Sequence, residues 1–175
     1  MKIDTKNIII SGICLALCMY LPFLTGQIQK FGQALAPMHI PVLLCGFFCG
    51  VRYAALVGAT APLLRFMLFG MPPLIPVGIP MCFELAAYGI VVALMYSLMP
   101  KKAVSVYVSL VTAMLIGRVV WGVAMWRFAE IALDVPFTFK AFLAGAFVDA
   151  VPGIILHIVI IPPIVIAVRG VFRTA

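Results

Sequence analysis

Long apolar stretches separated by short polar segments constrain the fold of this chain more than any other feature of its sequence. A helix of about 20 apolar residues spans the ~30 Å hydrocarbon core of a bilayer. We therefore predict an all-α integral membrane protein, a compact six-transmembrane-helix bundle that forms one domain over residues 1–175. The predicted helices cover roughly 7–24, 37–50, 53–69, 79–99, 104–128 and 141–168.

The composition excludes a soluble protein. Hydrophobic residues make up 66% of the 175 residues and charged residues only 10%, which is more apolar surface than a soluble domain of this size can bury. A net charge of +7 would suggest nucleic-acid binding in a soluble protein, but here most basic residues lie in loops between apolar stretches. We interpret them as topology signals and predict no nucleic-acid partner.

The distribution of these basic residues predicts that both termini are cytoplasmic, in a multi-pass protein of the cytoplasmic membrane. Seven basic residues then lie inside and three outside. The inner residues are Lys2, Lys6, Arg52, Lys101, Lys102, Arg169 and Arg173, and the outer ones are Lys30, Arg127 and Lys140. The second helix is short for a bilayer, but if it were re-entrant, five of the seven would move outside. The charge bias thus supports six spans.

Charged residues inside the predicted spans are unexpected because unpaired charge is costly in lipid. They are Arg65, Glu84, Arg118 and Asp149. At ~1.5 Å per residue, all four lie at about the same depth in the outer half of the membrane. One interpretation is a buried salt-bridge network that fixes helix register. The other is an outward-facing polar pocket in which the charges bind a small solute.

Aromatic residues at a similar depth favour the pocket. Phe83, Tyr88 and Trp121 are expected to wall it, with Trp126 nearer the mouth. His39, at the outer end of the second helix, is a further candidate binding residue.

Two prolines lie three residues from these charges, and each would free a helix carbonyl for a ligand or for water. Pro62 would free the carbonyl of Gly58, and Pro152 that of Val148. A tolerated kink is the alternative in both cases. His157 lies deeper in the last helix, and we interpret it as a structural, packed residue.

The sequence contains none of the common motifs of catalytic or metal-binding sites. The cysteines, at positions 14, 18, 45, 49 and 82, form no C-x-x-C motif, so we interpret them as packing residues rather than redox or metal-binding groups. The sequence lacks a P-loop and the common hydrolase motifs. We predict no catalytic residue, no cofactor and no bound metal. The apolar, proline-rich loop 70–78 is expected to fold back over the bundle.

Short motifs along nearly the whole chain resemble the substrate-binding S component (EcfS) of energy-coupling factor (ECF) vitamin transporters. They are GICLA at 12–16, MHIPVLL at 38–44, GMPPL at 70–74, and AGAF at 144–147 followed by PG at 152–153. The resemblance implies a non-enzymatic subunit that binds a vitamin or vitamin precursor from outside. It also implies docking on a transmembrane coupling subunit driven by two ATPases, which accounts for the missing P-loop.

The resemblance extends to the docking surface. In the family, two alanines four residues apart on the first helix contact the coupling subunit, and Gly12 and Ala16 occupy those positions here. Glycine in place of the first alanine is a departure. Nickel and cobalt members carry an N-terminal Met-His site, whereas this chain begins Met-Lys-Ile, so a metal substrate is not expected.

The substrate stays open among the vitamins and precursors of the family. Balanced charges with few aromatic residues favour a small, polar, anionic or zwitterionic solute over a large flavin. A self-sufficient carrier that uses Glu84 or Asp149 as a proton site is the alternative function. A membrane enzyme is a third, but no nucleophile and base cluster at one depth.

Overall fold

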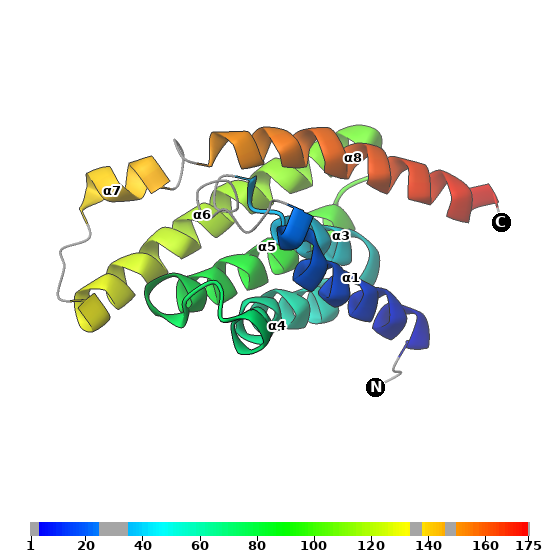
Figure 1. The fold of residues 1–175 in the computed structure, drawn as a ribbon. Coiled ribbons are helices and arrows are strands. Elements are labelled where there is room, and N and C mark those ends of the chain that lie inside the picture. The colour runs from blue at the N-terminus through cyan, green and yellow to red at the C-terminus, as the bar shows by residue number, and fades with distance from the viewer. Residues whose placement is uncertain (1–3, 25–34, 134–137, 146–149, 175) are drawn as a thin grey trace.

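The computed structural model describes residues 4–24, 35–133, 138–145 and 150–174, and every regular element among them is helical (Figure 1). The elements are α1 (Thr5–Leu24), α3 (His39–Cys49), α4 (Val51–Phe69), η1 (Leu74–Gly78), α5 (Ile79–Leu98), α6 (Ala103–Leu133), α7 (Phe139–Leu143) and α8 (Val151–Thr174). Five of the described helical segments are long and apolar enough to cross a membrane, and α3 is shorter. The predicted all-helical, membrane-spanning fold is confirmed.

Successive long helices run in alternating directions along the bundle (Figure 1). The start of α1 and the last turn of α8 lie at the same end, on the right of the view, together with the α3–α4 and α5–α6 connections. The α4–α5 connection and α7 lie at the opposite end. Among the described connections, the two that were predicted on the cytoplasmic side therefore lie at one end, and the 70–78 loop lies at the other.

α3 is the most enclosed helix of the bundle. It contacts α1, α4, α5 and α8, and the buried part of its 11 residues includes His39, Pro41, Val42, Leu43, Cys45, Gly46, Phe47 and Cys49. Because protein surrounds α3, a helix of about 16 Å does not need to match the thickness of the lipid. Gly50 then reverses the chain into α4 with a φ of 82°, a conformation that glycine adopts without strain.

The bundle is held together by close contacts between small residues. A Cβ added to Gly89 on α5 would lie 2.7 Å from the carbonyl oxygen of Ala54 on α4, so the two backbones touch at this point. Four of the predicted packing cysteines, namely Cys14 and Cys18 on α1 and Cys45 and Cys49 on α3, are buried in the core between these helices. No group that could hold a metal ion occurs in the described part of the chain.

The last predicted helix differs from the structure. Instead of one helix over 141–168, the described residues form α7 and then α8, with Ala150 in a turn before α8. The first helical hydrogen bond of α8 runs from Ile154 N–H to the Ala150 carbonyl, so Pro152 lies in the first turn. Proline suits this position because its missing N–H would have no partner there. Pro152 therefore starts a helix and does not kink one, while Val148 lies outside the described residues.

The proline-rich loop folds back onto the bundle as predicted. Its second half is the short segment η1, in which Ile75 is extended (φ −117°, ψ 131°); η1 leads directly into α5 and contacts α4, α5 and α6. The turn is closed by a hydrogen bond of 2.9 Å from Gly78 N–H to the Pro73 carbonyl. Gly70 ends α4 in the left-handed region, with its N–H donated to the Phe66 carbonyl.

Candidate functional site

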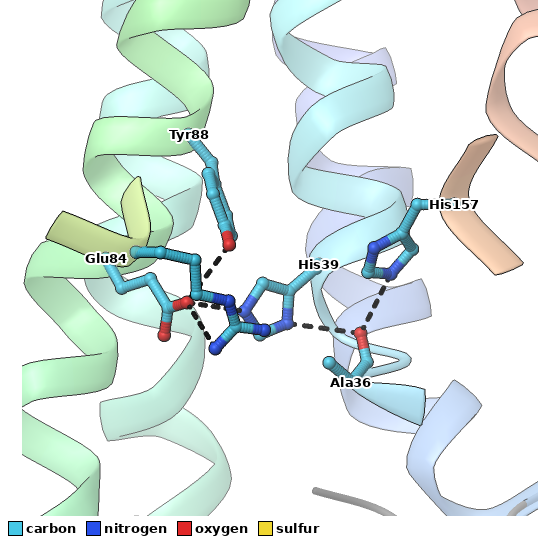
Figure 2. Close-up of polar contacts among 6 residues, drawn as sticks. Ala36, His39, Glu84, Tyr88 and His157 are labelled. Atoms are coloured by element: carbon cyan, nitrogen blue, oxygen red, sulfur yellow. Dashed lines mark hydrogen bonds and ion pairs between the residues drawn. The ribbon is translucent and has the colours of Figure 1, made fainter. Parts of the chain in front are cut away.

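A buried carboxylate on α5 lies at the centre of a polar cluster inside the bundle (Figure 2). Glu84 is only 2% exposed, and its Oε1 atom accepts a hydrogen bond of 3.1 Å from the hydroxyl of Tyr88, one turn further along the same helix. Arg118 Nη1 on α6 lies 3.1 Å from the same oxygen. The two helices are thus joined by an ion pair in which both charges are shielded from lipid and from water.

His39, the first residue of α3, lies on another side of Glu84 (Figure 2). Its Nδ1 atom lies 3.1 Å from the Ala36 carbonyl oxygen, so Nδ1 carries the proton that is donated. Its Nε2 atom lies 3.6 Å from Glu84 Oε1. The imidazole also packs edge-on against Tyr88, with 5.1 Å between ring centroids.

His157 on α8 also belongs to the cluster, where it is buried and packed as expected, although its contact with His39 was not predicted. Its Nε2 atom lies 3.4 Å from the same Ala36 carbonyl, and its ring stacks on His39 at a centroid distance of 5.9 Å. The sequence signal that could have identified His157 is its rarity, because the chain has only two histidines and both fall in apolar segments. We call Glu84, Tyr88, Arg118, His39 and His157 the Glu84 cluster.

A glycine on α6 positions the tyrosine of this cluster. A Cβ added to Gly117 would lie 2.2 Å from the Tyr88 ring, so the ring packs directly on the α6 backbone beside Arg118. Tyr88 is almost completely buried there. The absence of a side chain at Gly117 therefore allows the Tyr88 hydroxyl to reach Glu84.

Arg65 is buried on α4, where it contacts α1. Its Nη1 atom donates a hydrogen bond of 2.7 Å to the Met19 carbonyl. The guanidinium carbon lies 5.2 Å from the ring centroid of Phe23 and 5.4 Å from that of Phe69, so the charge is held between two aromatic rings. This contact fastens the C-terminal part of α1 to α4.

Of the four predicted intramembrane charges, the described residues contain one direct ion pair, that of Arg118 with Glu84. Arg65 makes its contacts elsewhere, and Asp149 lies outside the described residues. A shared depth does not imply contact, because successive side chains of a helix point in directions ~100° apart around its axis. The predicted meeting of Arg65 with the other charges does not occur among the contacts of the described chain.

The other aromatic candidates differ in their surroundings. Phe83 is 54% exposed and does not line a buried pocket. Trp121 packs against Gly145, where an added Cβ would lie 2.9 Å from the indole ring. Trp126 lines an open groove of about 440 Å³ between α6 and the segment around α7. The groove is lined by Val119, Gly122, Val123, Trp126, Thr138, Phe139 and Phe142.

Two nitrogen atoms of the cluster have unused hydrogen-bonding capacity. Arg118 Nε and His39 Nε2 are buried, and neither has a hydrogen-bond partner in the described chain. Native proteins satisfy the large majority of their buried polar atoms. These two nitrogens are therefore the atoms of the cluster that are left to contact a further polar group.

The predicted docking residues of α1 face outwards. Gly12 and Ala16 are both exposed, and a Cβ added to Gly12 would meet no atom within 4 Å. Ile9, Ile13 and Tyr20 on the same helix are more than half exposed. Packing of the Gly12 and Ala16 face inside the bundle, the alternative role for such residues, is not what the described structure shows.

Comparison with known proteins identifies the family. The chain matches the family model described as "ECF transporter, substrate-specific component" over residues 6–165. No curated protein and no solved structure matches the chain. The family match extends over most of α8 as well as the helices that carry the Glu84 cluster. The chain therefore belongs to the family of substrate-specific components of ECF transporters.

Proposed function

We propose that this protein captures a small water-soluble vitamin or vitamin precursor outside the cell and delivers it to an ATP-driven ECF coupling module. The Glu84 cluster carries the proposal. A buried ion pair that joins α5 to α6, with histidines from α3 and α8, places polar groups of four helices at one point inside an apolar bundle. Such groups inside a membrane protein typically mark a path or a site for a polar solute.

We further propose that the end of the bundle with the α3–α4 and α5–α6 connections faces the cytoplasm, in the cytoplasmic membrane. Lys102 is exposed at the α5–α6 connection. Its neighbour Lys101 donates from Nζ to the Tyr96 carbonyl at 2.6 Å, so it caps the end of α5. Basic residues at this end fit the cytoplasmic side by the positive-inside rule.

The outward face of α1 is the proposed docking surface for the coupling subunit. Gly12 and Ala16 lie one helical turn apart, and the absence of large side chains allows another helix to approach closely. The surrounding exposed apolar residues of α1 would otherwise face only lipid. Two ATPase subunits would supply the energy through that coupling subunit.

Reconstitution tests this function. The protein is purified, the retained small molecule is identified by mass spectrometry, and its uptake is measured in liposomes with and without an ECF coupling subunit, its ATPases and internal ATP. We expect uptake only with the complete module and ATP. Uptake by the chain alone under a proton gradient would instead support a secondary carrier, and a protein that binds no small molecule would contradict the proposal.

A further inference from the structure

The backbone carbonyl of Ala36 accepts hydrogen bonds from two histidines that lie on different helices (Figure 2). His39, the first residue of α3, reaches this oxygen with its backbone N–H at 3.0 Å and with Nδ1 at 3.1 Å. His157 on α8 reaches it with Nε2 at 3.4 Å. Because a carbonyl oxygen only accepts hydrogen bonds, His39 Nδ1 and His157 Nε2 each carry a proton, whatever the charge of either ring. Ala36 thus connects a histidine of α8 with one of α3.

Ala36 has a backbone conformation that needs such support. Its φ is 44°, in the left-handed region, which is disfavoured for a residue with a Cβ. Conformations of this kind persist where surrounding contacts hold them, and they are concentrated at functional sites. Two of the three donors belong to His39, which is close to Ala36 in the sequence. Among the three, His157 is therefore the one that holds the Ala36 carbonyl from a distant part of the chain.

The surroundings of the two histidines give this contact weight. Ala36 is 5% exposed and each histidine 3%, so the hydrogen bonds form in a low-dielectric interior, where they are stronger than in water. The two imidazole rings also stack, with centroids 5.9 Å apart and planes 28° apart. Loss of the His157 N–H would remove a donor from the buried carbonyl, and the Nδ1 proton of His39 would then lose its fixed acceptor.

We propose, on the basis of the binding role inferred above, that His157 is a positioning residue that holds the Ala36 carbonyl and thereby fixes the orientation of the His39 imidazole in the Glu84 cluster. A rotation of this imidazole would move Nε2, which lies 3.6 Å from Glu84 Oε1, and would disturb its packing on Tyr88. The alternative is that His157 only fills space where α8 contacts α3.

Three substitutions at position 157 separate a hydrogen-bond donor from a space-filling side chain. His157→Gln retains a donor, because the amide nitrogen of glutamine lies about where Nε2 of histidine lies. His157→Asn keeps the amide, but its side chain is shorter and does not reach the Ala36 carbonyl. His157→Phe keeps the size of the ring and removes the donor. His157→Gln should resemble the unaltered protein most if His157 positions His39, and His157→Phe should do so if it only fills space.

The state of His39 can be read directly by NMR, because the chain has only two histidines. The protein is labelled with isotope-enriched histidine, purified through an affinity tag that contains no histidine, and studied in detergent. Each variant then retains His39 as its single labelled residue. We expect a slowly exchanging Nδ1 proton on His39 in the unaltered protein and in His157→Gln. Its exchange should be faster by roughly fivefold or more in His157→Asn and His157→Phe.

Ligand binding provides the second measurement. The probe is the small molecule that the unaltered protein retains through purification, released by denaturation, identified by mass spectrometry and titrated into each variant by calorimetry. Each titration is made well below the melting temperature of the variant, so that only folded protein is compared. We expect His157→Gln to bind the probe roughly fivefold or more tightly than His157→Asn and His157→Phe, as is typical of one hydrogen bond.

The outcomes separate this inference from the proposed function. If His157→Phe matches His157→Gln in either measurement, or if His157→Gln and His157→Asn behave alike, His157 only fills space. An unprotonated His39 Nδ1 in the unaltered protein also overturns the proposal, and that measurement does not require any variant to fold. If all three variants bind the probe equally, the positioning role is wrong and the binding function stands. If the purified protein retains no small molecule, the proposed function is wrong and the role of His157 in binding fails with it.

Discussion

At the scale of single residues, Gly117 controls how Tyr88 meets Glu84. The Tyr88 ring occupies the space where a Cβ on residue 117 would lie, at 2.2 Å, and this ring is enclosed by the bundle. Gly117→Ala should therefore lower the thermal stability of the purified protein, with an overpacking cost of roughly 1 to 3 kcal/mol. It should also weaken ligand binding, because the hydrogen bond of Tyr88 to Glu84 is displaced. Thermal unfolding and ligand titration in detergent measure the two effects.

Gly12→Ala is the matched control for this prediction. Both glycines lie in helices, but a Cβ at position 12 would meet nothing within 4 Å. The control should be neutral or slightly stabilising, because alanine is the better helix former by up to about 1 kcal/mol. Equal melting temperatures for Gly117→Ala and the unaltered protein would show that Tyr88 does not pack on α6 as described.

Counting residues along a helix indicates which charged residues lie at one level, but it does not indicate the direction in which each side chain points. Counting residues from a helix end placed Arg118 and Glu84 at one level, and they form an ion pair. The same count placed Arg65 at that level, yet its side chain turns to the Met19 carbonyl on α1. Direction depends on helix rotation and on which helices become neighbours, and both are set by packing across the whole bundle. The contribution of His157 could not be predicted for the same reason.

At the scale of elements, α1 presents its small residues to the outside. We expect Gly12→Leu and Ala16→Leu to leave ligand affinity and thermal stability nearly unchanged while they block assembly with the coupling subunit and ATP-driven uptake. The reason is that both positions are exposed and a Cβ at Gly12 meets no atom within 4 Å, whereas a larger side chain at either position prevents close approach of another helix. Ligand titration, co-purification and whole-cell uptake are measured for each variant.

A substitution inside the bundle provides the contrast. Gly89→Leu places a side chain against the Ala54 backbone, 2.7 Å from where the Cβ would begin, and should reduce stability, binding and uptake together. If the α1 variants behave like Gly89→Leu, the α1 face packs internally in the working protein. If they retain both uptake and assembly, α1 is not part of the docking surface.

The helical elements follow largely from local sequence, whereas their interruptions do not. α5 was predicted over 79–99 and is observed at Ile79–Leu98. Its bounds could be predicted because the apolar run is continuous and begins with a proline, a residue that favours the first turn of a helix. The last helix was predicted as one element because apolar periodicity is similar on both sides of Pro152. Proline is compatible with a kink and with a first turn, and only the hydrogen bond from Ile154 to Ala150 distinguishes them.

At the scale of the whole molecule, the alternating helices predict which segments share a side of the membrane. We expect a cysteine introduced by Lys102→Cys, between α5 and α6, to react with a membrane-impermeant reagent only after the cells are opened. A cysteine introduced by Ile75→Cys, in the loop before α5, should react in intact cells. Both positions are exposed at the surface of the bundle, and they lie at the two ends of α5.

The native cysteines determine how this labelling experiment is controlled. Cys14, Cys18, Cys45 and Cys49 are buried, and Cys82 is partly buried, so the unaltered protein supplies the background that is subtracted from each variant. The physical reason for the expected result is the excess of basic residues at the end of the bundle that carries Lys102. Labelling of Ile75→Cys only in opened cells, with Lys102→Cys labelled in intact cells, would reverse the orientation and place the Glu84 cluster nearer the cytoplasmic side. Labelling of both from the same side would contradict α5 as a membrane-spanning helix, and with it the alternating six-helix topology.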